Sequence, residues 1–393
     1  MVHHSPVPSR RVRRALAAGT AVSLLLGLTA CTDDPEPAGV GESGTTEPDA
    51  DACRPEELPA PIDPEVVADA DLDGTTVTLA THDSFAVSDG VFDAFTEETG
   101  IEVELVSVGD AGTMVSQAIL TAGDPVADVM FGIDTTFLCR GTEAGLFVPY
   151  APEALADVPD EYELAPDDLA TPIDVGDVCL NYAKAAFPDE ADAPQSLDDL
   201  IDPAFADAFV TENPETSSPG LAFLLATIAE YGADGWEDYW ADLRDNGVEV
   251  VAGWEEAYDG SFAAGAEGAE RSIVTSYASS PVADVLYSDP LRDTSALGVV
   301  VDACFRQVEL AGVLRGTDEP EAAARLVDFL LSPRFQEDIP LNMFVTPVNE
   351  TAEVPEEYTA HSVEVAEPLT LTPAEIEAGR DAWTERWTEI VLR

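Results

Sequence analysis

The chain has 393 residues, and its 78 Asp and Glu residues outnumber 17 Lys and Arg residues, which gives a formal net charge of −61 at pH 7. A charge of this sign repels nucleic acid and anionic lipid and attracts small cations, so we expect no nucleic-acid partner. The roughly 320 residues that follow the N-terminal region exceed one ordinary core and indicate two lobes.

Residues 1–31 have the pattern of a secretory signal, because Arg10, Arg11, Arg13 and Arg14 precede the apolar run "ALAAGTAVSLLLGLTA" and a cysteine. The run is short for the ~20 apolar residues that a membrane span needs. The segment "LTAC" at residues 28–31 matches a lipobox, whose cysteine is lipidated and becomes the mature N-terminus. We therefore predict a signal peptide over residues 1–30 and a lipid anchor at Cys31, on the extracytoplasmic face of the cell membrane.

Residues 31–73 form a segment rich in Asp, Glu, Pro and Gly and nearly free of aromatic residues. Such a composition buries too little apolar surface to order itself fully. We expect this segment to be an acidic tether between the anchor and the folded part of the chain.

Strands and helices alternate over residues 75–145. The patterns predict strands within 75–86, 101–108 and 127–134, each followed by a helix, within 90–100, 111–124 and 135–145. This order implies a parallel sheet with right-handed crossovers, whose strand ends face a ligand crevice. The segments "HDSFA", "GDAGT" and "GIDTT" lie at those ends.

The pattern changes after residue 145. The sequence favours strands at 177–184, 248–253 and 304–316, and a strand and turn at 272–281. It favours a helix and turn at 196–210, a turn into a long helix at 211–232, and helices at 236–247, 319–340 and 372–393. In "SSPG", residues 217–220, a helix begins with free backbone N–H groups, which suits either a plain N-cap or an anion pocket.

Trp254 and Tyr258 stand at helical spacing in "GWEEAY", and Tyr277 follows among serines. An aromatic pair at this spacing is usually part of a core, so the residues alone leave packing and ligand contact as alternatives.

The sequence has none of the common catalytic signatures, such as G-x-S-x-G, a phosphate-binding loop or H-E-x-x-H. The cysteine spacing excludes a zinc knuckle, and only His82 and His361 remain after the signal peptide, so we expect no metal site. The four cysteines beyond Cys31 favour two disulfides outside the cytoplasm. A two-lobed protein of this kind is more simply a solute-capturing protein that closes around its ligand than an enzyme.

The segments "GIDTTFL", "SSPGL", "GWEEAY" and "SYASSP", in this order and spacing, resemble the thiamine-binding proteins of bacterial ABC importers. The resemblance implies an α/β fold of the two-lobed type II periplasmic-binding-protein kind, with crossing hinge strands. It implies a first lobe over 74–175, a second lobe over 176–305, and a return strand with C-terminal helices over 306–393 that pack across both lobes.

The resemblance also implies that the cleft holds thiamine or one of its phosphates, with no cofactor. A cationic, flat vitamin needs aromatic faces and a nearby carboxylate. Trp254 and Tyr277 match positions that pack against it, and small polar groups at 110–113 and 217–220 would hold its hydroxyethyl or phosphate end. His82 and Phe344 stand where a tyrosine and a tryptophan are expected. The implied ligand-binding set is His82, Asp83, Ser84, Asp110, Thr113, Asp134, Ser217, Ser218, Gly220, Trp254, Tyr258, Tyr277, Ser279 and Phe344.

Two further expectations rest on the resemblance. We expect the bridges Cys179–Cys304, between the two hinge strands, and Cys53–Cys139, between the tether and the helix after "GID", which is one of three possible pairings. We also expect a monomer that delivers its ligand to ABC permease subunits.

Alternatives remain for the ligand and the function. A polyamine would suit the same acids and aromatic residues. Ferric iron needs oxygen ligands, typically paired tyrosines, and the sequence has no adjacent tyrosine pair. An extracellular hydrolase is a more distant alternative.

Overall fold

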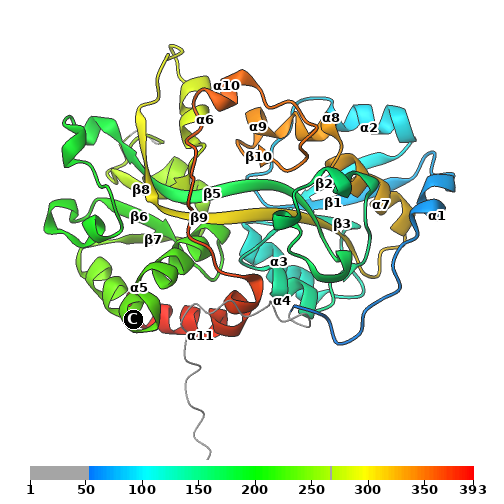
Figure 1. Ribbon diagram of the computed structural model, residues 1–393, viewed down its shortest axis with the longest axis horizontal. Coiled ribbons are helices and arrows are strands. Elements are labelled where there is room, and N and C mark those ends of the chain that lie inside the picture. The colour runs from blue at the N-terminus through cyan, green and yellow to red at the C-terminus, as the bar shows by residue number, and fades with distance from the viewer. Residues whose placement is uncertain (1–52, 266–267) are drawn as a thin grey trace, which may run out of the picture. The chain divides into compact units, whose positions relative to one another are not determined.

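The computed structural model describes residues 53–265 and 268–393, which belong to one compact unit. Its framework is one sheet with the strand order β2-β1-β3-β9-β5-β8-β6-β7, in which β4 pairs with β9 and β10 pairs with β5 (Figure 1). The strands in the described residues are β1 (Thr76–Thr81), β2 (Glu102–Ser107), β3 (Val129–Asp134), β4 (Phe147–Val148), β5 (Thr171–Ala183), β6 (Phe209–Glu212), β7 (Glu249–Val251), β8 (Ile273–Tyr277), β9 (Leu297–Leu314) and β10 (Thr346–Pro347).

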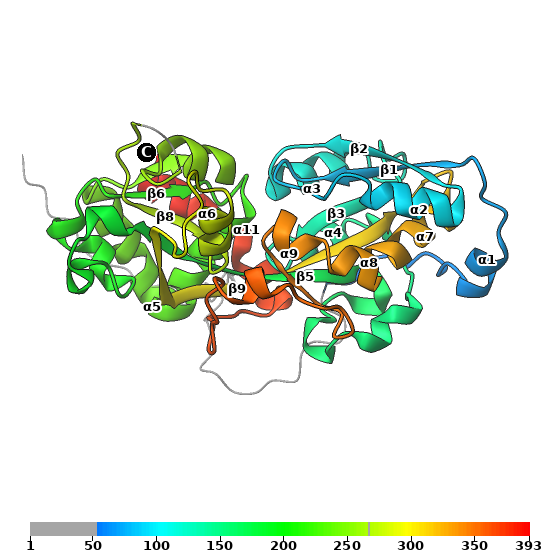
Figure 2. The same cartoon turned by 90° about the horizontal axis from the view of Figure 1, so that it is seen from above.

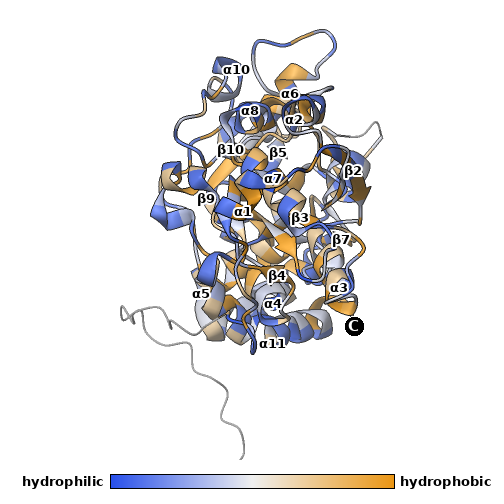
Figure 3. Cartoon of the chain, turned by 90° about the vertical axis from the view of Figure 1, so that its right-hand side faces the viewer, coloured by the Kyte–Doolittle hydropathy of each residue, from blue (hydrophilic) through white to orange (hydrophobic). Residues whose placement is uncertain are grey.

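Helices cover the sheet, and the ribbon is coloured by hydropathy in Figure 3. Apolar side chains of the strands and of the helices form the core. No helix in the described part of the chain is long and apolar enough to cross a membrane. The helices are α1 (Pro64–Asp69), α2 (Val91–Thr99), α3 (Ala111–Leu120), α4 (Leu138–Glu143), α5 (Ser218–Asp245), α6 (Ser280–Leu286), α7 (Pro320–Leu330), α8 (Pro333–Gln336), α9 (Ile339–Asn342), α10 (Glu356–Thr359) and α11 (Pro373–Val391).

The first lobe contains the predicted alternation of strands and helices. Strand β1 pairs in parallel with β2 and with β3, and α2 and α3 connect them. Helix α7 packs on β1 and β3, although it lies far along the chain. The parallel sheet predicted for residues 75–145 is therefore confirmed.

Two long antiparallel strands connect the lobes (Figure 2). Their pairing extends from Thr171↔Ala311 to Ala183↔Leu297. Strand β3 pairs with the last part of β9, whereas β8 pairs with the last part of β5. The expected boundary between residues 175 and 176 lies inside β5, and the boundary between residues 305 and 306 lies inside β9. The two-lobed α/β fold is confirmed.

The second lobe contains β8, β6 and β7, which pair in parallel, and α5 packs against β6 and β8. Helix α5 consists of two helical segments that meet at Gly232, whose non-helical φ of 68° suits glycine, so the expectation of two successive helices within 211–247 is confirmed. Helix α11 begins with a capping box, in which Thr372 and Glu375 bond each other's backbone N–H groups, and it packs on α5 and α4.

Two predicted helices were wrong in their extent. The segment 196–210 forms short 3₁₀ turns and then β6, because Pro203 interrupts the helical hydrogen bonds. The segment 319–340 forms three helices, since Pro333 and Pro340 lack an N–H group and lie in the first turns of α8 and α9.

The two disulfides have the expected pairing, Cys53–Cys139 and Cys179–Cys304. The second bridge joins β5 to β9 beside a register shift between Val178 and Leu180. The predicted lipidation site, Cys31, lies outside the described residues.

Candidate ligand-binding site

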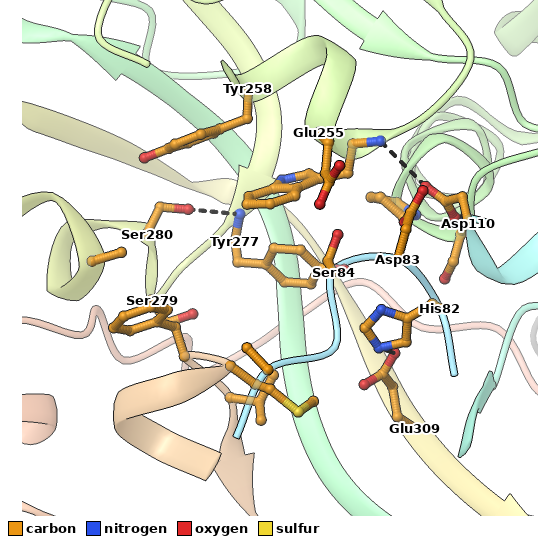
Figure 4. A pocket seen from close by; sticks show the side chains of 18 of the residues that line it. His82, Asp83, Ser84, Asp110, Glu255, Tyr258, Tyr277, Ser279, Ser280 and Glu309 are labelled. Atoms are coloured by element: carbon orange, nitrogen blue, oxygen red, sulfur yellow. Dashed lines mark hydrogen bonds and ion pairs between the residues drawn. The ribbon is translucent and has the colours of Figure 1, made fainter. Parts of the chain in front are cut away.

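Both lobes contribute to a cavity of about 310 Å³ at the carboxyl ends of β1 and β2 (Figure 4). The first lobe contributes the turn after β1 and the start of α3, and the second contributes the start of α5, residues 254–258 and the β8–α6 turn. The crossing strand β9 and residues 342–345 complete the wall. The lining residues are His82, Asp83, Ser84, Ala86, Asp110, Ala111, Ser218, Pro219, Trp254, Glu255, Tyr258, Tyr277, Ser279, Ser280, Ala283, Tyr287, Gln307, Glu309, Asn342, Met343, Phe344 and Val345.

Three aromatic side chains form one wall of the cavity. Trp254 stacks on Tyr258 with ring centroids 5.0 Å apart, and its ring centroid lies 6.3 Å from that of Tyr277. The indole orientation is fixed, because Nε1 of Trp254 donates to the Ser276 hydroxyl at 3.0 Å. Tyr258 also contacts the buried ring of Phe262, so it both lines the cavity and supports Trp254.

A glycine on β5 makes room for the ring of Tyr277. A Cβ atom at Gly176 would lie 3.1 Å from that ring, which is tighter than most side-chain contacts. Gly176 was not predicted, because the strand expected at 177–184 begins one residue after it, whereas β5 extends from Thr171 to Ala183.

His82 lies on the opposite side, where its ring packs on the backbone of β3. A Cβ atom at Gly132, whose φ is 98°, would lie 2.5 Å from the ring. Burial lowers the pKa of His82 to about 4, so the imidazole is neutral at neutral pH. Its Nε2 atom lies 3.7 Å from Oε1 of Glu309, a contact that is therefore not an ion pair under those conditions.

Phe344 meets Tyr287 in an edge-to-face contact, with ring centroids 5.6 Å apart. Tyr287 is 72% exposed, so this pair lies at the solvent-facing edge of the cavity. Phe344 has a positive φ of 59°, which is uncommon for a bulky residue, and it lines the cavity.

The N-terminus of α5 faces a carboxylate of the protein. Asp110 accepts hydrogen bonds from the backbone N–H groups of Ser218 at 3.1 Å and of Trp254 at 3.2 Å. Asp134 accepts a further bond from the Ser218 hydroxyl. Asp110, from the first lobe, therefore occupies the start of α5, the place at which the sequence was compatible with an anion pocket. The positive end of the α5 dipole attracts its carboxylate.

The cavity is acidic. Asp83, Asp110, Glu255 and Glu309 line it, and no Lys or Arg is among the lining residues of the described chain. Burial raises the pKa of Asp110 to about 6 and that of Asp134 to about 7. The hydrogen bonds to these carboxylates favour the ionised forms, but their effect is smaller than that of burial. In the described residues, no group of three or more His, Cys, Asp or Glu side chains is arranged to hold a metal ion.

The predicted site residues fall into two groups. Those that line the cavity are His82, Asp83, Ser84, Asp110, Ser218, Trp254, Tyr258, Tyr277, Ser279 and Phe344. Thr113, Asp134, Ser217 and Gly220 are not among the lining residues. Gly220 instead allows α5 to approach β6, since a Cβ atom there would lie 2.6 Å from the Glu212 carbonyl oxygen.

Several lining residues were missed by the sequence analysis. Glu255 follows Trp254 directly, and Gln307 and Glu309 are polar residues two positions apart in an apolar strand. That alternation places both side chains on one face of β9 and was a usable signal. Tyr287 and Met343 gave no comparable signal.

The comparisons with known proteins agree with this geometry. Residues 124–365 match the family described as bacterial extracellular solute-binding protein. The thiamine-binding periplasmic protein of Escherichia coli (strain K12) is 31% identical over 322 residues, which cover 81% of this chain and 94% of that protein. A solved structure of a periplasmic thiamin binding protein superimposes with a TM-score of 0.71 at 28% identity and covers 86% of this chain and 100% of its own.

Iron-bound HitA from Pseudomonas aeruginosa has a TM-score of 0.65 at 23% identity, over 80% of this chain and 99% of its own, which shows a shared fold alone. The sequence resemblance, the crossing strands and the two-lobed cavity agree with the family match. The chain belongs to the family of bacterial extracellular solute-binding proteins.

Proposed function

We propose that this protein captures thiamine and delivers it to an ABC importer. The observation that carries the proposal is the cavity wall of Trp254, Tyr258 and Tyr277, which faces acidic side chains with no basic residue among the described lining. Thiamine has a cationic thiazolium ring and a flat aminopyrimidine ring. Each contact between a cation and an aromatic face contributes about 0.5 to 2 kcal/mol. The names of the relatives that match most of the chain support the same ligand.

The lining suggests a role for each wall. Trp254 and Tyr277 would stack on the ligand rings, with Tyr258 supporting the indole. Asp83 and Glu255 would attract the positive charge, and Ser84 and Ser279 would bond its polar groups. The neutral imidazole of His82 can donate or accept one hydrogen bond, as a tyrosine hydroxyl can, whereas Phe344 offers only a ring face.

The structure favours thiamine over its phosphates. A phosphate group at the start of α5 would meet the Asp110 carboxylate, which already accepts the N–H groups of Ser218 and Trp254. The other lining acids would repel it as well. The hydroxyethyl group of thiamine carries no charge and avoids this repulsion.

Calorimetric titration of the purified protein with thiamine, its monophosphate, its diphosphate and spermidine tests the proposal. We expect thiamine to bind at least about tenfold tighter than any other compound in the set, a difference of about 1.4 kcal/mol. Spermidine that binds as tightly as thiamine would favour the polyamine alternative. A protein that takes up none of the thiamine compounds would contradict the proposed function.

We also propose that the protein is a monomer held at the membrane by lipid on Cys31. The basic and apolar run before "LTAC" supports this anchor. In bacterial cells, Cys31→Ser should abolish labelling by a fatty-acid probe and release the protein into the medium or the soluble extracytoplasmic fraction. Cys53→Ser, which removes a cysteine outside the lipobox, is the control and should retain the label. Membrane retention of Cys31→Ser would show that the anchor lies elsewhere.

A further inference from the structure

Three acidic residues lie side by side on the central strands beside the cavity. Asp134 on β3 pairs with Glu309 on β9, and Glu309 pairs with Asp174 on β5. Directly paired residues on adjacent strands project from the same face, with Cβ atoms about 4.5 to 5.5 Å apart. All three side chains are buried, and Glu309 lines the cavity below His82 (Figure 4). We refer to Asp134, Glu309 and Asp174 as the acid row.

Hydrogen-bond donors are distributed unequally along the acid row. Asp134 accepts bonds from the N–H and hydroxyl groups of Thr136, at 2.9 and 2.6 Å, from the N–H of Phe137 at 3.3 Å and from the Ser218 hydroxyl. These bonds favour its ionised form, but burial outweighs them and raises the pKa of Asp134 to about 7. Both carboxyl oxygens of Asp174 are buried, and no donor of the described residues reaches them. An ionised Asp174 would therefore be an uncompensated buried charge, which is costly.

The other groups that face Glu309 do not neutralise it. His82 is neutral at neutral pH, Tyr277 on β8 is neutral because burial raises the pKa of its hydroxyl, and Asp110 is itself an acid. Burial and the neighbouring carboxyls raise the pKa of Glu309 well above its usual range, and burial does the same for Asp174. A pair of adjacent buried carboxyls is most stable when it shares one proton, as a hydrogen bond between them.

A second observation links the acid row to a ligand. Gln307 lies two residues before Glu309, so both side chains are on the same face of β9. Gln307 is 1% exposed and lines the cavity, yet no donor of the described residues reaches its Oε1 atom. The cavity floor thus presents a buried acceptor next to the acid row, which suits a ligand that donates hydrogen bonds and carries positive charge.

We infer that Glu309 and Asp174 share one proton before the ligand binds, and that the positive charge of the ligand displaces this proton from the pair. This inference rests on the proposed capture of a cation. The proton leaves the carboxyl pair for the solvent as the cation enters, so the net charge of the site stays the same. Solute capture and proton release are then one coupled event.

The coupling gives a direction for the pH dependence. A proton and the cation compete for the same carboxyl pair, so lowering the pH weakens ligand binding. The effect approaches about tenfold in affinity per pH unit where one full proton is exchanged. This pH dependence of the affinity is expected at pH values between two limits. The lower limit is the pKa of the carboxyl pair with the cation bound, and the upper limit is the pKa of the pair without the cation.

Titration calorimetry with thiamine, in buffers of equal pH and different ionisation enthalpy, measures the proton release. The unmodified protein should release between about half a proton and one proton per thiamine bound at neutral pH. Glu309→Gln should release at least about half a proton less than the unmodified protein, because Gln cannot hold the exchangeable proton and its amide can donate to Asp174. The release that remains comes from Asp110 and Asp134, whose pKa values of about 6 and about 7 also lie near neutral pH. Asp83→Asn is the matched control, since Asp83 is an exposed lining carboxylate. It should weaken binding but leave the proton release unchanged.

Infrared spectroscopy of the protein without ligand gives a second measurement that does not depend on binding. The C=O band of a protonated carboxyl should be present in the unmodified protein and in Asp83→Asn, and reduced in Glu309→Gln and Asp174→Asn. Thiamine binding without proton release would overturn the shared proton. Spectra in which all variants keep the full C=O band would do the same. Neither result would contradict thiamine capture. If the spectra show the expected C=O bands but the protein does not bind thiamine, the shared proton would be supported and the proposed ligand would be overturned.

Discussion

Replacing Trp254 by alanine is expected to weaken thiamine binding by about thirtyfold or more, which corresponds to about 2 kcal/mol. The substitution removes the ring that would stack on the ligand, and it also leaves Tyr258 without its stacking partner at 5.0 Å. Calorimetric titration measures the loss of affinity. A parallel denaturant titration should show a smaller change in the free energy of unfolding than a core tryptophan gives, because the indole is only half-buried.

Trp240 on α5 provides the matched control for Trp254. Its ring is fully buried against Phe223 and Trp387, at centroid distances of 5.4 and 5.5 Å, and it does not line the cavity. Trp240→Ala should therefore cost about 3 to 5 kcal/mol of stability and leave the affinity of the folded protein nearly unchanged. If Trp254→Ala behaved in this way instead, Trp254 would be a core residue and the proposed site would lose its main contact.

Local patterns were sufficient for most elements of the fold. The alternation of strands and amphipathic helices over residues 75–145 predicts a parallel sheet, and β1, β2 and β3 form it. Strand β6 was missed because its four residues follow closely on turns, and so short a strand has no clear period. Prolines explain the other errors, since each one restarts or breaks a helix within a segment whose apolar period continues.

The candidate site was less accessible to sequence reasoning. The aromatic wall was expected because "GWEEAY" and "SYASSP" resemble a family motif, whereas spacing alone favoured a core. The acid row could not be found in this way, because its members are distant in sequence and only the register of β3, β9 and β5 brings them together. Asp110 was expected in the site, but its contact with the start of α5 was not, because it depends on how a loop of the first lobe meets a helix of the second.

Removing the bridge between the crossing strands, by the double substitution of Cys179 and Cys304 to alanine, is expected to lower the free energy of unfolding by about 2 to 5 kcal/mol. The bridge spans 125 residues, so its loss greatly enlarges the conformational freedom of the unfolded chain. It also joins β5 to β9 where the register shifts between Val178 and Leu180. Denaturant unfolding without reductant, compared with the unmodified protein, measures the change.

The double substitution of Cys53 and Cys139 to alanine is the control. It distinguishes the effect of a disulfide on the entropy of the unfolded chain from its effect on the local geometry of the crossing strands. This bridge spans 86 residues, so the loop-entropy contributions of the two bridges differ by only about 0.3 kcal/mol. Cys179, however, pairs with Ser276 on β8, whose hydroxyl accepts the hydrogen bond from Trp254. Loss of Cys179–Cys304 should therefore weaken thiamine binding as well as stability, whereas loss of Cys53–Cys139 should reduce stability alone. Equal effects of the two variants on affinity would show that the strand bridge does not help to position the aromatic wall.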